Sequence, residues 1–144
     1  MNIKKFLSPQ EKGEIVRAIA LAEEQTSGEI RVHMEKKCGQ HVLDRAAHWF
    51  KKLKMHRTEL RNGVLIYLAV QDKKFAILGD VGINRKVPAG FWDDVKDHMG
   101  SFFSQGKFTE GLTEGIRMVG EHLKEHFPHQ DDDRNELSND ISFG

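Results

Sequence analysis

The segment Arg61–Asn84, RNGVLIYLAVQDKKFAILGDVGIN, decides the fold of this chain. Its apolar run, Val64–Val70, is too continuous for a half-exposed strand and predicts a central strand covered on both faces. Gln71–Lys74 is long enough only for a hairpin turn, so Phe75–Leu78 is expected to pair antiparallel with that strand. Asp80 follows in a glycine-flanked loop that could carry function.

The residues that precede this segment predict a helix, a strand and a second helix. Ser8-Pro9-Gln10-Glu11 has the form of a capping box, and apolar residues at helical spacing follow it as far as Thr26. Apolar and polar residues alternate through Glu29–Glu35, which predicts a strand. Helical spacing returns in Leu43–Leu53, which predicts the second helix.

The residues that follow the segment predict two more helices and a polar tail. Pro88 is expected to open the third helix, whose apolar side runs to Phe103. Thr109 is expected to cap the fourth helix, which Pro128 ends. The last stretch has little to bury and contains the adjacent aspartates Asp131, Asp132 and Asp133, so we expect a domain over residues 1–128 and a disordered acidic tail over residues 129–144.

This order of elements predicts a single-domain α/β sandwich with a small mixed sheet and helices on both faces. The sheet is expected to hold three or four strands, two of them parallel through a right-handed crossover, plus the hairpin. Tracing the chain direction places Glu29, Arg61, Asn62 and Asp80 on one rim of the sheet. Residues 35–44 and the hairpin lie on the opposite rim.

Composition limits the class of protein. The chain has 144 residues, which suits one domain, and its 22 basic residues equal its 22 acidic residues, so no overall charge favours nucleic acid. No apolar run approaches the roughly 18 residues of a membrane span. The lone cysteine, Cys38, and the absence of a signal-peptide pattern favour a cytoplasmic protein.

Several short motifs, spaced in order along the chain, together resemble the TPM domain family. That family is named for a thylakoid lumen protein, a photosystem II repair protein and a nematode receptor modulator, and the chain is most similar to its compact bacterial branch. The resemblance covers about Phe6 to Pro128. The motifs are Thr26-Ser27-Gly28-Glu29-Ile30, Asn62-Gly63-Val64-Leu65-Ile66, Gly79-Asp80-Val81-Gly82-Ile83, Gly106-Lys107-Phe108 and Gly111-Leu112.

The resemblance implies an α/β sandwich, binding of divalent cations and, from the plant member, acid phosphatase activity. Calcium is the ion expected first and magnesium the second. Two positions depart from the family's longer pattern. Asn84 stands where an acidic residue is usual, and Pro88-Ala89-Gly90 stands where the next helix often begins with aspartate. The missing carboxylates favour binding over phosphatase chemistry.

The candidate cation site is the rim that holds Glu29, Asn62 and Asp80, joined by Asp93 or Asp94 from the start of the third helix. Calcium and magnesium prefer oxygen ligands, which these side chains supply. The alternative is structural, because aspartates also make turns and stabilise helix N-termini.

Two functions therefore remain open at the level of sequence. The first is a calcium-binding module that is non-catalytic or regulatory and acts through a protein partner. By analogy with the family, that partner could be membrane-associated, of the LemA type. The second is a metal-dependent phosphomonoester hydrolase in which Arg61 pairs a phosphate oxygen.

One further motif resembles a zinc site. His122-Leu123-Lys124-Glu125-His126 matches the inverted zinc-protease pattern H-x-x-E-H, with both histidines on one helical face. A catalytic zinc needs a third protein ligand, and only a short polar tail follows the motif. Histidines in a last helical turn are also favoured by the helix dipole alone, which is the interpretation we prefer.

Overall fold

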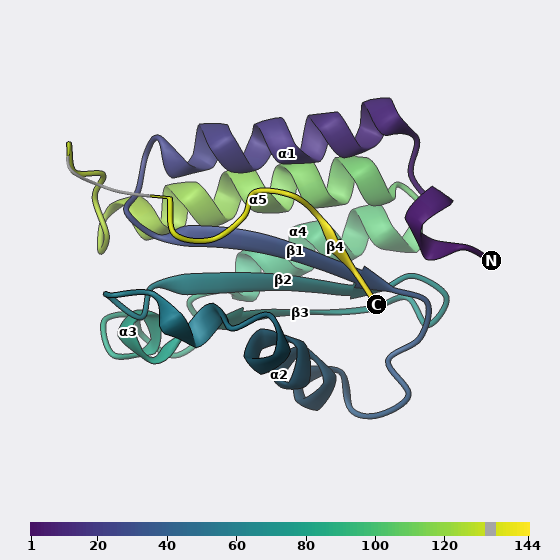
Figure 1. The fold of residues 1–144 in the computed structure, drawn as a ribbon, viewed down its shortest axis with the longest axis horizontal. Helices are drawn as coiled ribbons and strands as arrows, with labels where there is room; N and C mark the ends of the chain where they lie inside the picture. The colour runs from purple at the N-terminus through teal and green to yellow at the C-terminus, as the bar shows by residue number, and fades with distance from the viewer. Residues whose placement is uncertain (132–134) are drawn as a thin grey trace.

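The central layer is a four-stranded sheet in the order β3-β2-β1-β4, seen in a computed structural model that describes residues 1–131 and 135–144 (Figure 1). β1 pairs in parallel with β2 and with β4, and β2 pairs antiparallel with β3. The predicted fold class, an α/β sandwich with a mixed sheet, is confirmed. The strands are β1 (Glu29–Glu35), β2 (Gly63–Ala69), β3 (Lys74–Gly79) and β4 (Ser142–Phe143).

Helices cover both faces of this sheet (Figure 1). The helices α1, α4 and α5 form one layer, in which α5 packs against both α1 and α4. The helix α2 lies on the other face. The helical bounds are η1 (Ile3–Lys5), α1 (Pro9–Glu23), α2 (Val42–Lys52), η2 (Met55–Arg57), α3 (Val81–Asn84), α4 (Asp93–Ser104) and α5 (Phe108–Lys124). Within the described residues, no helix is both long and apolar enough to cross a membrane.

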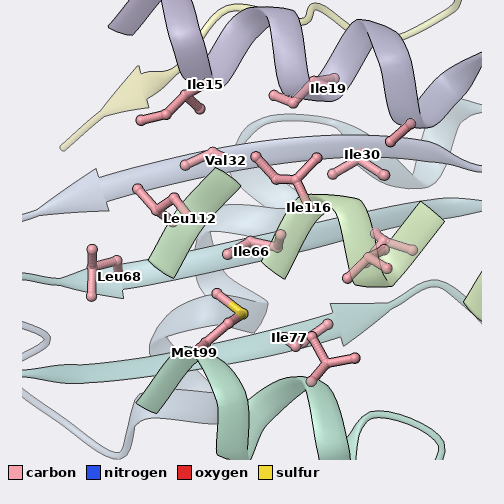
Figure 2. Packing of buried hydrophobic residues seen from close by; sticks show 14 of the residues in the cluster. Ile15, Ile19, Ile30, Val32, Ile66, Leu68, Ile77, Met99, Leu112 and Ile116 are labelled. Atoms are coloured by element: carbon pink, nitrogen blue, oxygen red, sulfur yellow. The ribbon is translucent and has the colours of Figure 1, made fainter. Parts of the chain in front are cut away.

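The alternation of side chains along β2 divides the core into two parts. Ile66 and Leu68 face the layer of α1, α4 and α5, as Figure 2 shows. Leu65 and Tyr67 face α2 and η2 on the opposite side. Every residue of β2 is buried, so the prediction of a central strand covered on both faces is confirmed.

Three details of the helices differ from the sequence predictions. The third long helix begins at Asp93 rather than at Pro88, because the chain turns at Gly90, which has a φ of 77°. The expected loop at Asp80 contains a short helix, α3, whose first N–H bonds the Asp80 side chain. Thr109 lies inside α5 instead of capping it, and its hydroxyl donates to the carboxylate of Glu11.

The segment 135–144, which we call the strap, differs from the expected disordered tail. Its Leu137 is buried, and its backbone continues into β4 beside β1. The carboxylate of Glu29 accepts the backbone N–H groups of Glu136 and Leu137. Composition alone did not indicate this packing, because one buried leucine and backbone pairing hold an otherwise polar segment. Asp132 and Asp133 of the expected tail lie outside the described residues.

Candidate functional site

Backbone pairing brings three of the predicted residues to one edge of the sheet, which we call the Glu29 rim. The N–H of Glu29 donates to the carbonyl of Asn62 at 3.0 Å, and the N–H of Asp80 donates to the carbonyl of Gly63 at 2.9 Å. These bonds follow from the chain direction, since β1 and β2 begin at this edge and β3 ends there. Glu29, Asn62 and Asp80 are all buried.

Asp80 forms a two-point ion pair with Arg61. The guanidinium donates to the carboxylate through Nε and Nη2, both at 2.8 Å, and the N–H of Val81 donates to the same carboxylate at 2.7 Å. Arg61 has a φ of 50°, a left-handed backbone that turns its side chain toward Asp80. The negative charge of Asp80 is therefore matched within the protein, and Arg61 is not held ready for a phosphate.

Asp93 and Asp94 belong to the helical layer. Asp94 lies 2.9 Å from Nε2 of His122 on α5, and Asp93 lies 3.9 Å from the ammonium of Lys96. The rings of both motif histidines, His122 and His126, contact Phe91. Across residues 1–131 and 135–144, no group of three or more histidine, cysteine, aspartate or glutamate side chains is placed to hold a metal ion.

A third carboxylate, Glu23, joins the Glu29 rim, and the sequence analysis did not predict it. Its Oε2 accepts the N–H of Ile30 at 2.9 Å, which places it at the start of β1. The pKa of Glu23 is raised to about 7, chiefly by burial; the hydrogen bond from Ile30 opposes this rise and the charge of Glu29 adds to it. Glu23 lies at the end of α1, where nothing in the helical pattern distinguishes it from a solvated residue.

Asn62 carries an unsatisfied oxygen at the same rim. Its Nδ2 donates to the carbonyl of Ser27 at 2.7 Å, which fixes the orientation of the amide. Its Oδ1 is buried and accepts no hydrogen bond from the described residues. Buried polar atoms are nearly always paired, so this oxygen is a candidate ligand atom.

An open pocket of about 350 Å³ lies beside the Arg61–Asp80 pair. Phe50 and Leu78 form its apolar part, and Lys51, His56 and Arg61 add basic groups. This combination suits a partly apolar, acidic ligand better than a bare cation.

The opposite rim holds a polar cluster that the sequence analysis did not predict. It is formed by three buried residues, His33, Glu35 and Tyr67, and two partly exposed ones, Arg45 and Trp49. The carboxylate of Glu35 accepts hydrogen bonds from Arg45 at 2.6 and 3.0 Å, from the indole of Trp49 at 3.2 Å and from the hydroxyl of Tyr67. Burial alone raises the pKa of Glu35, but the bonds from Arg45 and Tyr67 outweigh it and lower that pKa below its ordinary value.

His33 is fully buried inside this cluster. Its ring stacks on Trp49 with centroids 3.9 Å apart, and its Nδ1 lies 2.7 Å from the hydroxyl of Ser142 in the strap. Its Nε2 has no hydrogen-bond partner among the described residues. Burial lowers the pKa of His33 to about 4, so the ring is neutral at pH 7. The signal in the sequence is the alternation of Arg31, His33 and Glu35 along a strand with a buried neighbour.

The chain is similar to one known protein family and to several solved structures. A family model described as the TPM domain matches residues 2–122. No curated protein matches the chain. The BA42 protein of the psychrophilic bacterium Bizionia argentinensis has a similar structure, with a TM-score of 0.93, 50% identity and 99% of each chain covered.

Two more distant structures share the fold. The N-terminal domain of the cg2496 protein from Corynebacterium glutamicum is 12% identical, with a TM-score of 0.64, over 94% of this chain and 80% of that one. The N-terminal domain of a protein from P. gingivalis is 19% identical, with a TM-score of 0.70, over 88% of this chain and 83% of that one.

Proposed function

This chain belongs to the TPM domain family, and from that premise we propose that it is a divalent-cation-binding module, without catalytic activity of its own, that acts through a protein partner. Calcium is the ion that the family resemblance implies, with magnesium as the second candidate. The proposed site is the Glu29 rim.

The observation that carries the cation proposal is the buried, unsatisfied Oδ1 of Asn62. An amide oxygen is an ordinary calcium ligand, and leaving it unpaired in a buried place costs free energy. Because Nδ2 is held by Ser27, the amide cannot turn over to relieve the oxygen. A bound cation would satisfy it.

The charge of the same rim supports the proposal. Glu23 and Glu29 lie close enough for the charge of one to raise the pKa of the other. A divalent cation would relieve this repulsion and keep Glu23 ionised at neutral pH. Calcium takes six to eight oxygen ligands, so backbone carbonyls and water would complete its coordination.

We do not include Asp80 in this set, because Arg61 and the N–H of Val81 already satisfy its carboxylate. The same pairing supports a non-catalytic role. A metal-dependent phosphatase at this rim would need Asp80 to bind the metal and Arg61 to bind the phosphate, and each residue is engaged with the other.

Calorimetric titration with calcium and with magnesium tests the cation site. We expect the wild-type protein to bind calcium, and Glu23→Gln and Asn62→Leu to weaken binding by about tenfold or more, since each removes a ligand oxygen or its charge. Asp80→Asn is the matched control, because it neutralises a buried carboxylate of the same rim that Arg61 holds. Its affinity should stay within about threefold of wild type.

Two results would contradict the cation proposal. A wild-type protein that releases or absorbs no heat with either ion has no such site. A loss of affinity confined to Asp80→Asn would move the site to the Arg61–Asp80 pair. Thermal unfolding of each apo variant shows whether a loss of binding comes from a loss of folding.

An aryl phosphate assay tests the absence of catalysis. We expect no turnover above background with calcium, magnesium or chelator. Metal-dependent turnover that disappears in both Asp80→Asn and Arg61→Met would establish the phosphatase instead.

A further inference from the structure

The strap pairs with the edge of β1 through very little secondary structure. β4 is two residues long, with Ser142 opposite His33 and Phe143 opposite Met34. One more backbone bond follows, from the N–H of Gly144 to the carbonyl of Met34 at 3.0 Å. Without these bonds, β1 would present an unpaired parallel edge over the polar cluster.

The side chains along this edge of β1 restrict which residues can lie at positions 142 and 144 of the strap. The hydroxyl of Ser142 meets Nδ1 of His33 at 2.7 Å. A Cβ atom at position 144 would lie 2.6 Å from Trp49, 2.8 Å from the Glu35 carboxylate and 2.9 Å from Nε2 of His33. We call the surface formed here by His33, Glu35 and Trp49 the seat. It therefore accepts a hydroxyl residue opposite His33 and, two residues later, glycine.

The strap fills this seat incompletely. Leu137 is its only buried residue, and Ile141, Ser142 and Phe143 are each half-buried. Nε2 of His33, buried and facing Gly144, keeps no hydrogen-bond partner in the described structure. An extended segment that supplied a hydrogen-bond partner for this nitrogen would bind the same edge more favourably.

The seat continues beyond Gly144 into a basic pocket. This pocket of about 370 Å³ is lined by Glu35, Lys36, Lys37, Gln71 and Gly144. Lys36 and Lys37 are exposed, whereas the Glu35 carboxylate is occupied by Arg45, Trp49 and Tyr67. A strand that ran past the position of Gly144 would therefore meet two lysines.

We infer that the edge of β1 at His33–Glu35 is a strand-addition site for an extended segment of a partner protein, and that the strap occupies it in cis. The partner segment carries a serine or threonine opposite His33, a glycine two residues later and acidic residues after the glycine. The inference rests on the proposed partner role and adds the chemistry of the partner.

The test uses the full chain with its own strap displaced. Leu137→Asp places a carboxylate where the buried leucine side chain lies, beside Glu29. The leucine side chain of Gly144→Leu cannot fit against Trp49. The double variant should keep its far-UV circular dichroism while its seat becomes open. Asn135→Ala, an exposed substitution within the strap, is the matched control with the seat closed.

Two labelled peptides serve as probes: the strap sequence NELSNDISFG followed by two aspartates, and the same sequence followed by two lysines. By fluorescence anisotropy, the acidic peptide should bind the double variant at least about tenfold more tightly than it binds wild type or Asn135→Ala, whose straps compete intramolecularly. It should also bind more tightly than the lysine peptide. In ¹H–¹⁵N spectra, binding should shift the indole N–H signal of Trp49, which donates to Glu35.

A folded double variant that binds neither peptide, or binds both equally, would overturn the inference. Binding that leaves the Trp49 signal unmoved would place the peptide elsewhere and overturn it as well. If the double variant does not fold, Gly144→Leu alone gives the same comparison. Calcium titration of wild type and of Gly144→Leu, whose substitution lies at the opposite rim from Glu29, separates the two proposals, because either kind of binding can be lost while the other persists.

Discussion

At the scale of single residues, hydrogen bonds to the carboxylate of Glu35 explain why this strand residue can keep an ionised side chain under α2. Three side chains donate to its carboxylate, and two of them, Arg45 and Trp49, come from α2. A buried charge is costly unless it is paired and hydrogen-bonded, and here both conditions are met. These bonds link α2 to β1 and β2.

Tyr67→Phe tests this arrangement with the smallest change. The substitution removes one hydroxyl donor from a buried carboxylate and leaves the ring in place, so the free energy of unfolding should fall by about 1–2 kcal/mol. Urea unfolding at pH 7 measures the change. Arg45→Met serves as the comparison. It should lower the free energy of unfolding more than Tyr67→Phe does, because it leaves the Glu35 carboxylate without a counter-charge. The opposite ranking would contradict the role assigned to the pair.

Single residues also show where sequence reasoning stopped. Asp80 and Arg61 are both recognisable in the sequence as polar residues beside a strand. The sequence predicts a metal ligand at Asp80 and a phosphate ligand at Arg61, and it does not predict that the two side chains pair. Their mutual pairing depends on the left-handed turn at Arg61, which brings the guanidinium back to the end of β3. No local pattern in the sequence specifies that turn.

At the scale of elements, the close approach of α5 to its neighbours depends on small residues. A Cβ at Gly111 would lie 2.4 Å from Phe103, and one at Gly115 would lie 2.4 Å from Met99 on α4. One at Gly120 would lie 2.9 Å from the Cβ and 3.2 Å from the Cα of Ala22. No local pattern in the sequence distinguishes Gly120, because only the packed structure places Ala22 of α1 against it.

Gly120→Ala and Gly13→Ala form a matched pair of helical glycine substitutions. Alanine at position 120 meets the backbone of α1, so despite its better helix propensity it should lower the free energy of unfolding by about 1–2 kcal/mol. Gly13 lies inside α1 with nothing within 4 Å of its added Cβ. Gly13→Ala should therefore raise the same quantity by about 0.5–1 kcal/mol. Equal effects in chemical denaturation would contradict the packing of α5 on α1.

At the scale of the whole molecule, the two rims of the sheet respond to pH in opposite directions. Burial lowers the pKa of His33 to about 4, from an ordinary value of 6.5. Burial raises the pKa of Glu23 to about 7, from an ordinary value of 4.5. As the pH falls below 6.5, His33 becomes protonated in the unfolded chain before it does so in the folded protein, and the free energy of unfolding therefore decreases. A rise in pH above 4.5 ionises Glu23 in the unfolded chain first, which also removes stability.

We therefore expect the wild-type free energy of unfolding to change little between pH 4.5 and 6.5, because the two effects oppose each other. Glu23→Gln isolates the His33 effect, and its stability should fall as the pH is lowered from 6.5, by up to about 3 kcal/mol near pH 4. His33→Gln isolates the Glu23 effect, and its stability should fall as the pH is raised from 4.5 to 7. Urea unfolding across this range measures both slopes, and slopes of the same sign would contradict the assignment.

The sequence by itself determined the architecture. Strand and helix periods, a capping box and the hairpin at Gln71–Lys74 are local patterns, and chain direction then placed Glu29, Asn62 and Asp80 on one rim. Tertiary structure alone decided how those residues are used. Hydrogen bonds between distant segments pair Asp80 with Arg61, bring the strap to Glu29 and bury His33 beneath Ser142. Such contacts depend on side-chain geometry at long sequence separation, which no periodic pattern encodes.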